Sequence, residues 1–146
     1  MKDPTPSMAQ QVVLAASAFQ QQNTGHAPQS ITAALSGDTL VITMQGALTP
    51  AEKILCRVPS GAAQVQEFHR QLFATSAASL RDAIKRITGF AVRGAATEIE
   101  QTSGTLVQVP ETGAMVQVFQ LEGNISREKW EASEPAKSKQ SMPYLN

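Results

Sequence analysis

The residues best suited to chemistry in this chain are two histidines and one cysteine. His26 and His69 are the only histidines, and Cys56 is the only cysteine. A structural zinc site takes four Cys or His ligands, and a catalytic zinc site takes three ligands plus water. No CxxC or HExxH spacing groups these three residues. The sequence therefore predicts no metal site and no bound cofactor.

The sequence also shows no set of residues suited to nucleophilic or acid–base catalysis. Cys56 would need an activating base, and its place between Leu55 and Arg57 in a short predicted helix is typical of a half-buried packing thiol. His69 is expected at the surface edge of the core. The carboxylates form no pair with acid–base spacing, and the P-loop, GxGxxG and GxSxG motifs are absent. We expect a non-enzymatic protein without catalytic residues.

A small anion is the ligand for which the sequence offers a candidate site. The loop Gly25–Pro28 resembles a helix stop, and a second predicted helix begins at Thr49. Free amides and the positive dipole end of a helix start can hold bicarbonate or phosphate. The competing interpretation is that Thr49 and Glu52 close a capping box and satisfy these amides themselves. The candidate anion-binding residues are Gly25, His26, Thr49, Ala51 and Glu52.

Two aromatic residues in the C-terminal segment are candidates for binding a partner. Trp130 and Tyr144 are the only Trp and Tyr of the chain, and they lie in the polar segment 124–146. Binding energy in protein interfaces concentrates in buried Trp and Tyr side chains. The alternative is that Trp130 packs on the chain's own domain.

Periodic apolar positions and turn residues predict the order α-β-β-α-α-β-β. Apolar residues that recur every three or four positions predict a helix that begins at Met8 and a long helix over 61–88. Apolar and polar residues alternate on both sides of the turn Ser36–Asp38, which predicts a hairpin. A further strand is expected from Phe90, with a bulge at Gly94. The nearly continuous apolar run 115–121 is typical of a central strand.

This order predicts an α+β fold in which helices lie mostly on one face of a sheet. We expect a two-layer sandwich with a mainly antiparallel sheet of four to five strands. Residues 1–7 are expected to be a frayed terminus, 8–123 a single domain and 124–146 a polar tail. The long helix is predicted to bury Val65, Phe68, Leu72, Leu80, Ile84 and Ile87.

Charge and composition exclude some classes of partner. The 146 residues hold 12 Lys plus Arg and 12 Asp plus Glu, whereas electrostatic binding of nucleic acid requires a clear surplus of Lys and Arg. No apolar run approaches the roughly 18 residues that span a bilayer, and no signal-peptide core is present. A lone cysteine suits a reducing compartment. We expect a soluble cytoplasmic protein without membrane insertion.

Several segments in a fixed order resemble a known bacterial family. They are Gly25-His26-Ala27-Pro28, Ser36-Gly37-Asp38-Thr39-Leu40-Val41, Gly46-Ala47-Leu48-Thr49-Pro50-Ala51-Glu52-Lys53, residues 80–89 ending in Thr88-Gly89, and residues 116–122. Together they are similar to the MpsC-like family, long described as a domain of unknown function, over about residues 10–122. The resemblance implies a small soluble component of a membrane-potential-generating system, linked to bicarbonate uptake and to two membrane-associated partners.

The resemblance therefore implies a non-enzymatic accessory or regulatory protein that acts by binding protein, with a membrane transport protein as a partner. The alternative is a small-anion-binding or catalytic domain, with its site near the Gly25–Pro28 loop and the start of the Thr49 helix.

The last predicted strand also bears on assembly. Val116 and Val118 project to the side opposite the strand's other apolar residues. Their simplest cover is the same surface of a second copy, so we expect a two-fold homodimer. The alternative is that the segment around Trp130 folds over this face.

Overall fold

The computed structural model describes residues 5–93, 104–109 and 114–132. The predicted order of helices and strands is present and is followed by one short helix. The elements are α1 (Met8–Thr24), β1 (Ser30–Ser36), β2 (Thr39–Gln45), α2 (Pro50–Leu55), α3 (Pro59–Thr88), β3 (Gly104–Val109), β4 (Ala114–Gln120) and α4 (Arg127–Glu131).

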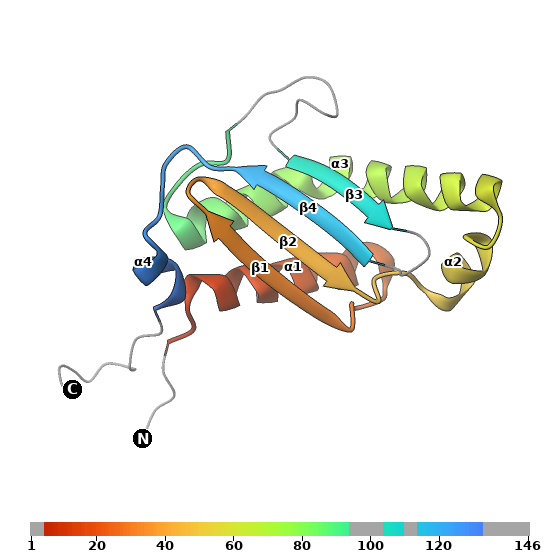
Figure 1. Ribbon diagram of the computed structural model, residues 1–146, viewed down its shortest axis with the longest axis horizontal. Coiled ribbons are helices and arrows are strands. Elements are labelled where there is room, and N and C mark those ends of the chain that lie inside the picture. The colour runs from red at the N-terminus through yellow and green to blue at the C-terminus, as the bar shows by residue number, and fades with distance from the viewer. Residues whose placement is uncertain (1–4, 94–103, 110–113, 133–146) are drawn as a thin grey trace.

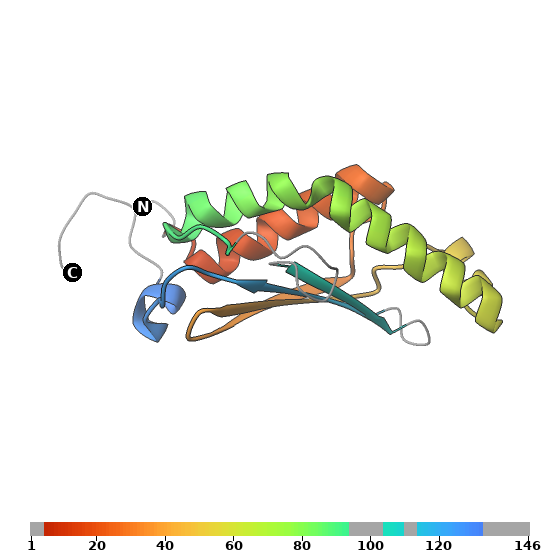
Figure 2. The ribbon, with the colours of Figure 1, turned by 90° about the horizontal axis from the view of Figure 1, so that it is seen from above.

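The strands form one antiparallel sheet in the order β1-β2-β4-β3 (Figure 1). Two hairpins, β1–β2 and β3–β4, are therefore joined through the pairing of β2 with β4. Figure 2 shows α1 and α3 side by side against one face of this sheet, with no described element against the other. The predicted α+β class is confirmed, and β4 lies inside the sheet, as its continuous apolar run indicates.

Local signals in the sequence set the ends of the two long helices. Ser7 caps α1 in a capping box with Gln10. Gly25 ends α1 at φ 73°, and Gly89 ends α3 at φ 84°. Both glycines take the left-handed conformation that residues with a Cβ rarely adopt. The chain can therefore turn sharply from each helix toward the sheet.

The core lies between the helix layer and the inward face of the sheet. Phe119 of β4 is fully buried, and its ring lies 5.9 Å from that of Phe73 on α3. Strands β2 and β4 alternate buried with partly exposed positions. The buried residues of this cluster on the two long helices and central strands are Val12, Ala16, Leu40, Ile42, Met44, Leu80, Ile84, Met115 and Phe119.

The predicted buried face of α3 is correct in its C-terminal half and shifted in its N-terminal half. Val65, Leu80 and Ile84 are buried as predicted, and Leu72 and Ile87 are partly buried.

The prediction for Phe68 is wrong, because its side chain is 49% exposed. The prediction for His69 is also wrong, because this residue is only 2% exposed. Buried positions at Gly61, Val65 and His69 follow steps of four. A step of four advances about 40° beyond one helical turn, so the buried stripe rotates away from Phe68.

Of the strand expected from Phe90, the structure describes only residues 90–93, which form a single bridge. Val92 pairs with Leu121 just beyond the end of β4. The expected bulge at Gly94 lies outside the described residues.

The core continues beyond residue 123. Ser126 caps α4, and Ile125 and Trp130 are both buried in the main hydrophobic cluster. Helix α4 packs against α1. Trp130, a candidate for binding a partner, is only 4% exposed, and its ring packs in the chain's own core, which is the alternative that the sequence offered. Tyr144 lies outside the described residues.

Candidate functional site

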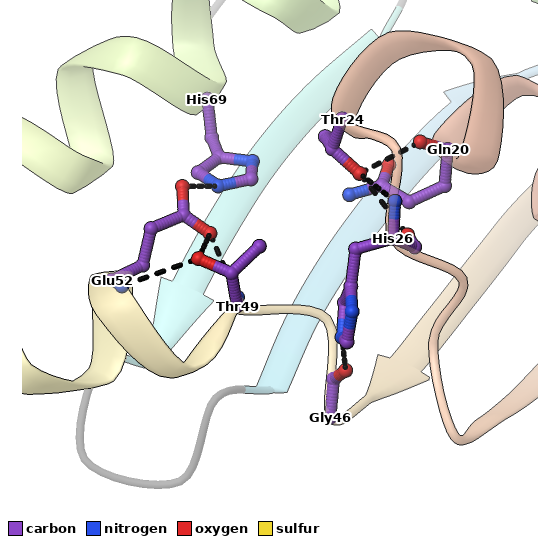
Figure 3. A network of polar contacts seen from close by, with 7 residues as sticks. All are labelled: Gln20, Thr24, His26, Gly46, Thr49, Glu52 and His69. Carbon is purple, nitrogen blue, oxygen red and sulfur yellow. Dashed lines mark hydrogen bonds and ion pairs between the residues drawn. The ribbon is translucent and has the colours of Figure 1, made fainter.

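The structure brings together the two segments proposed for anion binding. The Nε2 atom of His26 lies 3.0 Å from the carbonyl oxygen of Gly46, which is three residues before Thr49. The hydroxyl of Thr24 accepts from the backbone N–H of His26 and so fixes the loop from the other side. Figure 3 shows His26 beside the chain that leads into α2. The loop and the start of α2 are therefore neighbours, as the sequence indicates.

The start of α2 is closed by its own side chains. The backbone N–H of Thr49 donates to Oε1 of Glu52 at 2.9 Å, and the backbone N–H of Glu52 donates to the Thr49 hydroxyl at 3.2 Å. This is the capping box that the sequence offered as the alternative. The Glu52 carboxylate places negative charge at the point where an anion would bind.

The hydrogen bonds of the other candidate residues also stay within the chain. The backbone N–H of Gly25 donates to the Gln21 carbonyl oxygen at 2.8 Å, which completes the end of α1. The side chain of Ala51 is exposed and carries no polar group. The backbone N–H groups of four candidate residues donate to acceptors within the chain: Gly25, His26, Thr49 and Glu52.

Glu52 also connects α2 to α3. Its second carboxylate oxygen, Oε2, lies 2.8 Å from Nε2 of His69. The two side chains are 13% and 2% exposed, so the pair is shielded from water. An ionised carboxylate can only accept hydrogen bonds, so this contact requires the Nε2–H of His69 as donor. This arrangement holds α2 against α3 with one shielded polar contact.

A small, partly open cavity lies on the other side of His69, between α1, α3 and the centre of the sheet. Its volume is about 20 Å³. Gln20 and Gln117 line it and are 7% and 5% exposed. The Nε2 atom of Gln20 and the Oε1 atom of Gln117 are buried without a hydrogen-bond partner. The cavity is lined by Ala16, Phe19, Gln20, Asn23, Met44, His69, Leu72, Phe73, Ser76, Leu80, Met115 and Gln117.

Sequence reasoning missed this cavity, although one signal was present. Gln117 occupies an inward position of β4 between Met115 and Phe119, where alternation calls for an apolar residue. A polar side chain at such a position requires a partner in the core.

Cys56 is a partly buried thiol at the end of α2. Burial raises its pKa, and the nearby negative charge of Glu52 raises it further. Because the thiolate is the reactive form, this environment suppresses nucleophilic chemistry. Within the described ranges, no group of three or more His, Cys, Asp or Glu side chains is placed to hold a metal ion.

A surface rich in exposed apolar side chains lies at the far end of α3. Figure 1 shows α2 and the start of α3 extending beyond the sheet. Four of the five exposed large apolar residues in the described chain lie between residues 54 and 68, in α2, the link to α3 and the first third of α3: Ile54, Leu55, Val58 and Phe68, which we call the apolar arm. Helix α2 has no buried residue. Patches of this kind mark interaction sites more often than isolated exposed residues do.

The apolar arm has a defined shape because of one glycine. A Cβ atom at Gly61 would lie 2.0 Å from the carbonyl oxygen of Leu55. Only glycine allows the backbones of α2 and α3 to approach this closely.

The second exposed surface is the face of the sheet opposite the long helices. Val41 pairs with Val118 and Thr43 pairs with Val116, and all four are partly exposed. The outward positions of β1, β2 and β4 carry no charged residue; they are Ser30, Thr32, Ala34, Ser36, Thr39, Val41, Thr43, Gln45, Ala114, Val116, Val118 and Gln120. We call this surface the open sheet face.

None of the helices in residues 5–93 and 114–132 is long and apolar enough to cross a membrane.

Comparison with known proteins agrees with the resemblance noted in the sequence. The family model described as "Na+-translocating membrane potential-generating system (MpsC)" matches residues 5–122. The chain is 24% identical over 109 residues to the uncharacterized protein YbcI of Bacillus subtilis (strain 168), covering 75% of this chain and 88% of YbcI. No solved structure matches the chain. Because the family model spans most of its length, the chain belongs to the MpsC family.

Proposed function

We propose that this chain is a non-enzymatic cytoplasmic accessory protein that acts by binding protein within a membrane-potential-generating system serving bicarbonate uptake. Family membership supports the association with such a system. The resemblance in the sequence supports the link to bicarbonate and to membrane-associated partners.

The apolar arm is the observation that carries the proposal. Ile54, Leu55, Val58 and Phe68 are 46–59% exposed and lie within 15 residues of the chain. Burying the exposed part of each against a partner would contribute about 1 kcal/mol. The carboxylate–imidazole contact between Glu52 and His69 keeps this surface in place. A rigid apolar surface loses little conformational entropy when it binds.

The partner is proposed to be a polypeptide of the system's membrane part. Lys53 and Arg57 are exposed beside the arm, so an apolar patch with an acidic rim would complement it. The arm's surface is too short and too sparse in basic residues for a strong interaction with lipid headgroups alone.

Sedimentation with membranes of the source bacterium tests this role. The wild-type chain is expected to sediment with the membranes, and the variant Ile54→Ser/Val58→Ser/Phe68→Ser is expected to stay in the supernatant. The variant Leu14→Ser is the matched control, because Leu14 is 62% exposed on α1, away from the arm.

Protease treatment of the membranes distinguishes protein from lipid. Loss of binding after this treatment is the expected result. Equal binding to untreated and treated membranes, or equal binding of the arm variant, would contradict the proposal.

We further propose that the open sheet face pairs with the same face of a second copy. A solvated protein surface usually carries charged residues at about a quarter to a third of its positions, whereas the outward positions of β1, β2 and β4 carry none. The Val and Thr side chains at its centre are suited to packing one sheet on another. The helix α4 packs against α1 and leaves this face open (Figure 2).

A further inference from the structure

The cavity beside His69 presents three polar atoms that complement one another. Gln20 contributes a donor, the Nε2–H group, and Gln117 contributes an acceptor, Oε1. His69 contributes its second ring nitrogen, Nδ1, because Nε2 is used by Glu52. Figure 3 shows Nδ1 of His69 and the amide nitrogen of Gln20 pointing toward one another. The three side chains come from α1, α3 and β4.

The roles of these atoms follow from the contacts behind them. The Glu52 carboxylate accepts from Thr49 and from His69, so it supplies no proton. An imidazole that carries its one proton on Nε2 presents Nδ1 as an acceptor. The cavity therefore offers one donor and two acceptors.

The size of the cavity restricts the ligand to a single small group. A buried water requires at least about 10–15 Å³ measured in this way and two to four polar partners. The cavity provides about 20 Å³. One water can accept from Gln20 and donate to Gln117 and to His69, which uses both of its hydrogens.

We propose that this cavity is a binding site for one water molecule that joins Gln20, His69 and Gln117. The water satisfies the two amide atoms that would otherwise be buried without hydrogen-bond partners. It also extends a hydrogen-bonded chain from Glu52 through His69 to the centre of the sheet. The helix layer and the sheet are thereby linked by a polar contact inside an apolar core.

The site has a second consequence for His69. A water that donates to Nδ1 favours the tautomer with the proton on Nε2, which is the tautomer that Glu52 requires. The water and the carboxylate therefore support the same state of the ring from opposite sides.

Nuclear magnetic resonance of the full-length protein tests the site. A nuclear Overhauser cross-peak between water and the side-chain amide protons of Gln20 is expected in the wild-type chain. The ring nitrogen shifts of His69 are expected to show the Nε2–H tautomer, with His26 identified from the variant His26→Gln. In Gln117→Met the cross-peak is expected to fall to background.

The matched control is Gln22→Met, since Gln22 is exposed on α1 and lies outside the cavity. It is expected to keep the cross-peak at wild-type intensity. Absence of the cross-peak from the folded wild-type chain, or its persistence in folded Gln117→Met, would overturn the proposal. The wild-type spectrum alone decides the matter if Gln117→Met fails to fold.

Discussion

Replacement of Glu52 by alanine is expected to lower the free energy of unfolding by about 3 kcal/mol. The change removes the partner of His69, whose ring is almost completely buried. It also leaves the backbone N–H of Thr49 without its acceptor. The free energy of unfolding is expected to fall less in the variant Glu52→Gln, because the Gln carbonyl oxygen can still accept a hydrogen bond from Thr49 or from His69. Urea unfolding followed by circular dichroism measures both changes.

Glu67→Ala is the matched control for this prediction. Glu67 is an exposed carboxylate that pairs with Arg70 on the surface of α3. Its pKa is lowered by hydrogen bonds from Arg70 and Gln71, but exposed pairs of this kind contribute little to stability. The urea midpoint of Glu67→Ala is expected to match the wild type. An equal loss in Glu52→Ala and Glu67→Ala would show that the contact with His69 has no special role.

Replacement of Val118 by lysine is expected to separate a dimer into single chains. Val118 lies near the centre of the open sheet face, opposite Val41 of β2. In a two-fold pair the added ammonium groups of the two copies would be brought together without a partner, and burying such charges is costly. The fold itself is expected to persist, because a lysine on an open face can extend its charge into water.

Light scattering measures this change directly. The wild type is expected to have twice the chain's mass of 15.6 kDa, and Val118→Lys is expected to have that mass itself. The control Gln22→Lys adds the same charge to an exposed position of α1 and is expected to remain a dimer. A wild-type mass of one chain at micromolar concentration would contradict the proposed pairing.

Local signals in the sequence predicted much of the fold. The capping box at Thr49 and the glycine stop at Gly25 act within a few residues, so their geometry follows from residue type and spacing. The alternation in β1 and β2 likewise specifies which side chains face the core.

The contacts around His69 could not be predicted in this way, because they join residues that are far apart in the sequence. Glu52 and His69 are 17 residues apart and meet because α2 folds back against α3. Gln20 and Gln117 line one cavity only because α1 lies over the sheet. The exposure of Phe68 also escaped prediction, because the buried stripe at the start of α3 follows steps of four through Gly61, Val65 and His69 and so passes beside Phe68.

Photo-cross-linking from the apolar arm tests most directly whether the chain acts by binding a membrane protein. A benzophenone amino acid in place of Phe68 keeps an aromatic side chain at an exposed position. The same group in place of Gln22 is the control. With membranes of the source bacterium, position 68 is expected to yield one adduct with a membrane polypeptide, and position 22 is expected to yield none. Adducts with lipid alone, adducts of equal yield from both positions, or no adduct from position 68 would contradict the account.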